Sequence, residues 1–128
     1  MLCSEIFNAA LKLLGEVGGE SENPDYAERA PFIIASFIGE ASGADKLYRE
    51  AHGLDKKEIP DRVYVPLEEE FPLHARLASP CTHYLASILI SDENPELSES
   101  YYDRYCDSIS AILSALPSRS ESIADVYK

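Results

Sequence analysis

Three histidines, His52, His74 and His83, are the side chains in this sequence best suited to acid–base or metal chemistry. Cys81 lies two residues before His83, and on a helix two residues at this spacing point about 200° apart. They therefore cannot easily bind one metal ion, and none of the histidines belongs to a recognisable ligand or catalytic motif. We accordingly expect no metal, no cofactor and no catalytic histidine.

Carboxylates gather in two places, at residues 68–70 and at Asp92 and Glu93, and their oxygens are the ligands that a hard cation prefers. Neither place has the spaced acids and central glycine of a calcium loop, so solvated acidic loops are the favoured interpretation. The glycines within residues 15–19 lack the strand and the Lys-Ser/Thr ending of a phosphate-binding loop. The sequence predicts a non-enzymatic protein, and a site formed only between subunits is the remaining enzymatic alternative.

The net charge limits the kinds of partner that the protein can bind. The chain has 23 acidic and 11 basic residues, which gives a net charge of −12. Such a chain repels phosphate backbones and anionic lipid headgroups, so we expect neither specific nucleic-acid binding nor binding to a membrane surface. A simpler interpretation is that the charge keeps the protein in solution. The acids are concentrated in residues 1–28 and 92–107, whereas residues 45–62 hold five acidic and five basic residues.

The three cysteines, Cys3, Cys81 and Cys106, form no disulfide pattern, because their number is odd and their spacing is wide. We interpret them as reduced thiols of a cytoplasmic protein, with Cys81 and Cys106 on apolar helix faces. The first residues include Glu5 and lack a basic segment, so no secretory signal is expected. The longest apolar-rich stretch, residues 30–38, is too short to cross a membrane.

Apolar residues recur every three or four positions in four segments, which predicts a mainly α fold, a bundle of about four helices. The expected helices cover residues 4–16, 24–52, 72–91 and 95–116. Asn23 and Asn94 each precede a proline and an acid, which is a strong signal for a helix start. Pro31 is expected to kink the long second helix. The helical bundle is expected over residues 1–117, and residues 118–128 are a C-terminal tail that suits an assembly arm.

Tyrosine is abundant in this chain, with eight copies and no tryptophan. Its ring packs well while its hydroxyl stays in water, so it suits both cores and interfaces. Tyr84, Tyr101 and Tyr105 lie on the apolar stripes and are expected in the core. Tyr64 and Tyr127 lie outside the expected helices and are better candidates for contact with another subunit.

Two apolar segments lie outside the expected helices, one near residues 62–66 and one in the last six residues. The first is β-branched and aromatic, which predicts a short extended piece that is too isolated to form a sheet. The second fits a helical turn or an extended arm, with a frayed terminus as the alternative. The bundle does not obviously bury either segment, so we expect both to contact another subunit. The candidate interface residues are Val63, Tyr64, Val65, Ile123, Val126 and Tyr127.

The order of the helices and four short motifs resemble the small helical head-to-tail connector proteins, also called adaptor or head completion proteins, of tailed bacteriophages and prophages. The motifs are IFNAALKLLG at residues 6–15, Arg76-Leu77-Ala78, YLASIL at residues 84–89, and Tyr102-Asp103-Arg104-Tyr105. The resemblance implies a non-enzymatic structural protein that assembles as a homo-oligomeric ring between portal and tail. It also implies contacts with portal and tail proteins, and DNA that passes through the ring without specific binding. The expected location is the bacterial cytoplasm during assembly and then the virion, with no membrane contact.

The acidic composition also fits a second class of protein. A small acidic regulatory or adaptor protein of the cytoplasm, for example a DNA mimic that occupies a basic partner, acts by protein–protein binding as well. It differs from a connector in that it needs no self-assembly. The two hypotheses therefore make opposite predictions for the oligomeric state.

Overall fold

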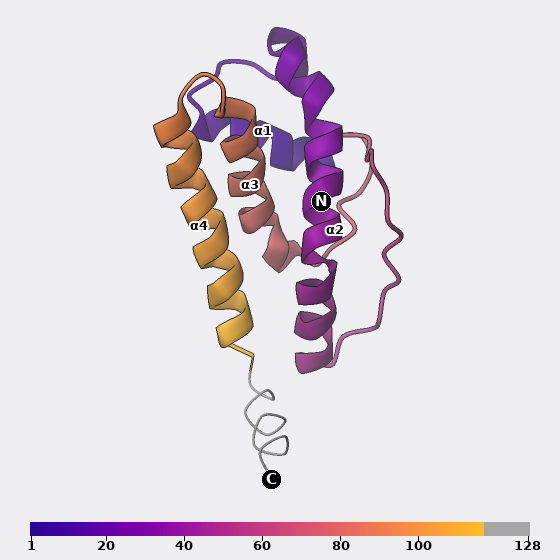
Figure 1. Ribbon diagram of the computed structural model, residues 1–128. Coiled ribbons are helices and arrows are strands. Elements are labelled where there is room, and N and C mark those ends of the chain that lie inside the picture. The colour runs from indigo at the N-terminus through magenta and orange to yellow at the C-terminus, as the bar shows by residue number, and fades with distance from the viewer. Residues whose placement is uncertain (117–128) are drawn as a thin grey trace.

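The computed structural model describes residues 1–116, and in that part of the chain four α-helices pack together without a sheet (Figure 1). The elements, in chain order, are α1 (Cys3–Leu13), η1 (Glu20–Glu22), α2 (Pro24–Ala51), η2 (Ala75–Leu77), α3 (Ala78–Ile90) and α4 (Pro95–Ser114). The mainly α fold expected from the sequence is therefore confirmed. Residues 62–66 are assigned to no strand, and an isolated bridge joins Leu2 to Glu70.

The connection between α2 and η2 caps the start of α1. The backbone N–H groups of Cys3 and Ser4 donate to the carbonyls of Glu69, at 2.9 Å, and Leu67, at 2.8 Å. From its type and position, the sequence predicts Ser4 as the N-cap of this helix. That prediction is wrong, because these carbonyls satisfy the first N–H groups and the helix begins at Cys3. At the other end, Gly15 has a φ of +76°, a left-handed conformation that ends the helix before residue 16.

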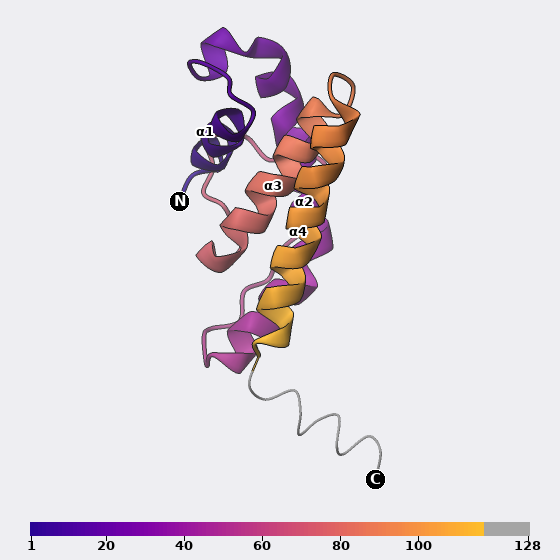
Figure 2. The same ribbon diagram turned by 90° about the vertical axis from the view of Figure 1, so that its left-hand side faces the viewer.

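α2 is one helix of 28 residues that continues through Pro31, Gly39 and Gly43. Its path curves along its length, as expected for a helix with an internal proline (Figures 1 and 2). The start at Pro24 agrees with the sequence prediction. So does the end before Gly53, whose φ is +66°.

α3 and α4 form an antiparallel pair that lies side by side in both views (Figures 1 and 2). Two reciprocal hydrogen bonds join them, since each hydroxyl of Ser87 and Ser98 donates to the other residue's carbonyl at 2.8 Å. Pro80 lies inside the helix expected over residues 72–91, where a proline should either kink the helix or delay its start. The structure has the delayed start, because α3 begins at Ala78 and Pro80 lies in its first turn, where no N–H is needed. α4 begins as predicted, and the Oδ1 atom of Asn94 accepts from the Leu97 N–H at 3.1 Å.

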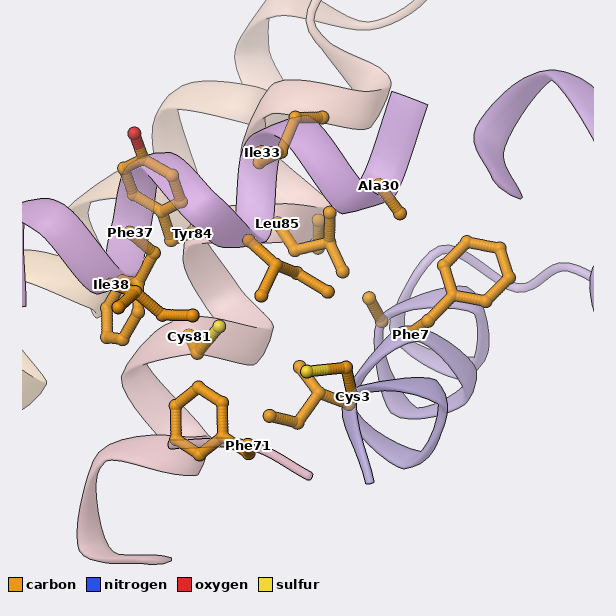
Figure 3. Close-up of a cluster of buried hydrophobic side chains, with 14 of the residues drawn as sticks. Cys3, Phe7, Ala30, Ile33, Phe37, Ile38, Phe71, Cys81, Tyr84 and Leu85 are labelled. Atoms are coloured by element: carbon orange, nitrogen blue, oxygen red, sulfur yellow. The ribbon is translucent and has the colours of Figure 1, made fainter. Parts of the chain in front are cut away.

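The core lies where α1, α2 and α3 meet (Figure 3). Phe7 from α1, Phe37 from α2 and Leu85 from α3 have no exposed surface. Cys81 is buried among them, as predicted. The prediction that Cys106 lies on an apolar face is wrong, because α4 packs on one side of the bundle and turns this thiol to solvent. The core therefore lies mainly between three helices, and α4 contributes Tyr101, Tyr105 and Ile112 to it.

Candidate interaction surface

The three histidines that the sequence offers for chemistry belong to no group of potential metal ligands within residues 1–116. Within residues 1–116, no group of three or more His, Cys, Asp or Glu side chains is placed to hold a metal ion. The Nδ1 atom of His83 lies 2.9 Å from the Ser79 carbonyl, and that of His52 lies 3.0 Å from the Tyr48 carbonyl. The third, His74, accepts from a backbone N–H two residues further along at 3.0 Å. Each imidazole thus bonds to its own segment of backbone.

The buried tyrosines and thiols are arranged for packing. Tyr84 and Tyr105 are buried as predicted, with ring centroids 5.0 Å apart, and the Tyr84 hydroxyl donates to the Glu40 carboxylate at 2.8 Å. Burial raises the pKa of both phenols to about 12 and the pKa of the Cys3 thiol to about 11. A phenol or thiol that stays protonated at neutral pH is a weak nucleophile. These groups therefore pack in the core, where the Tyr84 hydroxyl also donates a hydrogen bond.

Residues 52–74, here called the α2–η2 loop, are held in place by contacts within the loop and with α2. The Arg62 guanidinium donates to both carboxylate oxygens of Glu69, at 2.7 and 3.1 Å, and this pairing lowers the pKa of Glu69. The Val65 N–H donates to the Pro31 carbonyl of α2 at 3.1 Å, and the Val65 side chain is 2% exposed. The prediction that Val65 belongs to a subunit interface is wrong, because this bond to α2 seats its side chain in the core.

The other two residues of that segment are exposed, as the sequence predicts. Val63 is 82% exposed and Tyr64 is 44% exposed. The Tyr64 ring meets Phe32 of α2, which is 53% exposed, edge to face with centroids 5.0 Å apart. Phe32 and Tyr64 thus contact each other at the surface, and Val63 is exposed next to Tyr64 in the chain. We call these three residues the apolar patch. Large side chains of this kind, left in water together, are typical of protein-binding surfaces.

Phe32 is the member of the apolar patch that the sequence interpretation missed. The buried stripe of α2 runs through its neighbour Ile33, and Phe32 lies three residues from Arg29 and four from Ser36, on the polar side. An aromatic side chain out of register with the apolar stripe was the available signal. The three tail residues proposed for the interface, Ile123, Val126 and Tyr127, lie outside the described residues.

α4 presents a second surface of distinct character, a row of acids. Four carboxylates lie three or four residues apart on the exposed side of the helix, and none forms an ion pair within residues 1–116. They are Glu96, Glu99, Asp103 and Asp107. We call this row the acidic face of α4. Its field attracts a basic partner.

The fold and these surfaces define a small, mainly α-helical protein. Among the described helices, none combines the length and the apolar character needed to cross a lipid bilayer. Comparisons with models of protein families, with characterised protein sequences and with solved structures found no match to the chain.

Proposed function

We propose that this chain is a non-enzymatic protein that assembles with copies of itself, as a subunit of a phage or prophage head-to-tail connector. The observation that carries the proposal is the apolar patch. Phe32 and Tyr64 each leave about half of a large aromatic ring in water although they pack against each other. Burial of apolar area at about 25 cal/mol per Å² favours covering such side chains with another protein surface.

The apolar patch is also held ready for binding. Phe32 projects from the continuous helix α2, and Tyr64 precedes Val65, which is fixed in the core and bonded to Pro31. Because the backbone on both sides of the patch is already ordered, a partner does not have to order it on binding. This pre-organisation supports a surface selected for contact.

A ring requires that the apolar patch of one subunit bind a different surface of the next. Such head-to-tail contacts close into rings when the rotation between subunits divides a full turn. A net charge of −12 suits a ring around DNA, because an acidic channel does not retain the phosphate backbone. In this proposal the ring lies between portal and tail proteins, and DNA passes without specific contacts.

Size-exclusion chromatography with light scattering tests self-assembly through a matched pair of variants. Val63 and Val17 are both 82% exposed and both lie outside the helices, but only Val63 belongs to the apolar patch. We expect the wild-type chain to elute as a multiple of its 14.2 kDa mass. The double variant Phe32→Ser, Val63→Ser should elute as a monomer, and Val17→Ser should keep the wild-type mass.

Two outcomes would contradict the proposal. A wild-type chain that stays monomeric at all concentrations would refute self-assembly. A Val17→Ser variant that dissociates as readily as the Phe32→Ser, Val63→Ser double variant would refute the role of the apolar patch. Electron microscopy of the assembled fraction then tests the connector form. Closed rings support a connector, whereas two-fold dimers refute the ring while leaving self-association.

The acidic face of α4 favours a second candidate function, an acidic regulatory protein that binds a basic partner in place of DNA. The observation that supports this alternative is its row of carboxylates, which form no ion pair within residues 1–116. A strict monomer that displaces DNA from a basic protein favours it. Neutralising Glu99 and Asp103 as Glu99→Gln and Asp103→Asn should then weaken the displacement, whereas ring assembly through the apolar patch does not depend on these two charges.

A further inference from the structure

A cavity of about 230 Å³ lies between the second half of α2 and the start of the α2–η2 loop. Its lining residues are Ser42, Gly43, Lys46 and Arg49 from α2, and Lys56, Lys57, Glu58 and Ile59 from the loop. Four of the 11 basic residues of a chain with net charge −12 thus surround one cavity. We call it the basic cavity. It shares no residue with the apolar patch or with the acidic face of α4.

The arginine of the basic cavity is fixed in position by the fold. Its Nε donates to the buried carboxylate of Asp45 at 2.9 Å, and Asp45 in turn accepts from the His74 N–H at 2.7 Å. A second contact runs from an Nη of Arg49 to the Asp55 carbonyl at 3.5 Å. A guanidinium carries five N–H groups, so donors remain for an anion in the cavity. Arg49 is therefore oriented before any ligand arrives.

The basic cavity also contains three lysines. Within residues 1–116, none of Lys46, Lys56 and Lys57 forms an ion pair. Asp45 neutralises Arg49, and Glu58 is the one acid among the lining residues, so the lining with Asp45 carries a net charge of about +2. Like charges that share a cavity repel one another, and a bound dianion removes that repulsion.

The basic cavity opens to solvent, and its volume of about 230 Å³ is enough for a small solute. Phosphate and pyrophosphate are small enough to enter it. Gly43 adds to the space, because a Cβ built at this residue would meet no atom within 4 Å.

We infer that the basic cavity binds a small phosphate anion, either free phosphate or pyrophosphate, through Arg49 and the three lysines. Arginine matches phosphate oxygens with paired N–H donors, and lysine adds point charges. The inference is independent of the proposed self-assembly, because no residue of the apolar patch lines the cavity. It assigns this acidic protein a site for a small phosphate anion.

Isothermal titration with inorganic phosphate and with pyrophosphate, at constant ionic strength, tests the site. Gly43→Leu fills the cavity, whereas Gly39→Leu, on the same helix and equally free of neighbours, does not line it. We expect Gly43→Leu to abolish binding and Gly39→Leu to leave the affinity unchanged. The double variant Lys56→Gln, Lys57→Gln should weaken binding at least tenfold, and the control Lys12→Gln should not.

The two anions distinguish the ligand, since tighter binding of pyrophosphate indicates a diphosphate and equal binding indicates a single phosphate group. The absence of binding by the wild-type chain at millimolar concentration of both anions would overturn the inference. So would an equal loss of affinity in Lys12→Gln and the lysine double variant, because the effect would then be one of net charge. The double variant Phe32→Ser, Val63→Ser should lose self-assembly and still bind the anion, because no residue of the apolar patch lines the cavity. The two proposals can therefore fail independently.

Discussion

Asp45 lies in the second half of α2 with a relative exposure of 1%, and both of its carboxylate oxygens are engaged. One oxygen accepts from the His74 backbone N–H at 2.7 Å, and the other accepts from the Arg49 Nε at 2.9 Å. The first contact joins α2 to the segment that leads into η2, and the second orients the arginine of the basic cavity. We predict that Asp45→Ala destabilises the fold more than any surface substitution.

The magnitude follows from the groups that lose their acceptor. Removing one partner of a buried ion pair costs about 3–5 kcal/mol, because the remaining charge stays out of water without compensation. The Arg49 side chain retains 16% exposure, so water replaces part of the lost contact, and we take the lower end, about 3 kcal/mol. For a chain of this length that loss lowers Tm by about 10 °C. Asp45→Asn keeps one carbonyl for His74 but turns an amide toward Arg49, so it should lose about half as much free energy.

Urea denaturation followed by circular dichroism, at one fixed protein concentration, measures the free energy of unfolding of each variant. Asp61→Ala removes an exposed carboxylate of the α2–η2 loop and serves as the control, with an expected change within about 0.5 kcal/mol. A loss below about 1 kcal/mol in Asp45→Ala would refute the reasoning. So would an Asp45→Asn variant as unstable as Asp45→Ala, since the His74 contact would then carry no energy.

Two further predictions concern pH and helix capping. Burial raises the pKa of Tyr26, Tyr84 and Tyr105 to about 12, whereas unfolding returns each to about 10, so stability should be unaffected by these groups below pH 10 and fall as pH rises from 10 to 12. Each tyrosine adds up to about 1.4 kcal/mol per pH unit to that fall, and denaturation at a series of pH values should show a shallower slope in Tyr105→Phe. Asn94→Ala should cost about 1 kcal/mol by uncapping α4, measured against the exposed Asn8→Ala on α1.

The helices that the sequence predicts well are those with local start signals. α2 and α4 begin at the expected residues because a proline after an asparagine fixes the first turn without help from the rest of the chain. α1 begins earlier than expected because its acceptors come from Leu67 and Glu69, more than sixty residues away. No pattern within the first 16 residues contains that information.

Burial of single residues was harder to predict than helix order. Val63 and Val65 have the same side chain in the same segment, but only Val65 is buried, next to its backbone hydrogen bond to the Pro31 carbonyl of α2. Asp45 was counted among the charges of a neutral segment, yet it is buried because Arg49 and the backbone of His74 converge on it. Both outcomes depend on contacts between segments far apart in sequence, which periodicity does not report.

The α2–η2 loop is longer than a connection between two packed helices needs to be. Loops above about 12–15 residues without regular structure are uncommon in compact domains, and they are usually functional when they are ordered. Fixing the backbone costs about 1–2 kcal/mol per residue, so the anchors at Arg62, Val65 and His74 must offset a large entropy loss. A shorter loop would avoid that cost but would present neither Tyr64 beside Phe32 nor the lysines of the basic cavity. The loop also caps α1 and supplies Leu67, Phe71 and Leu73 to the core, so its length serves the fold as well as the two proposed surfaces.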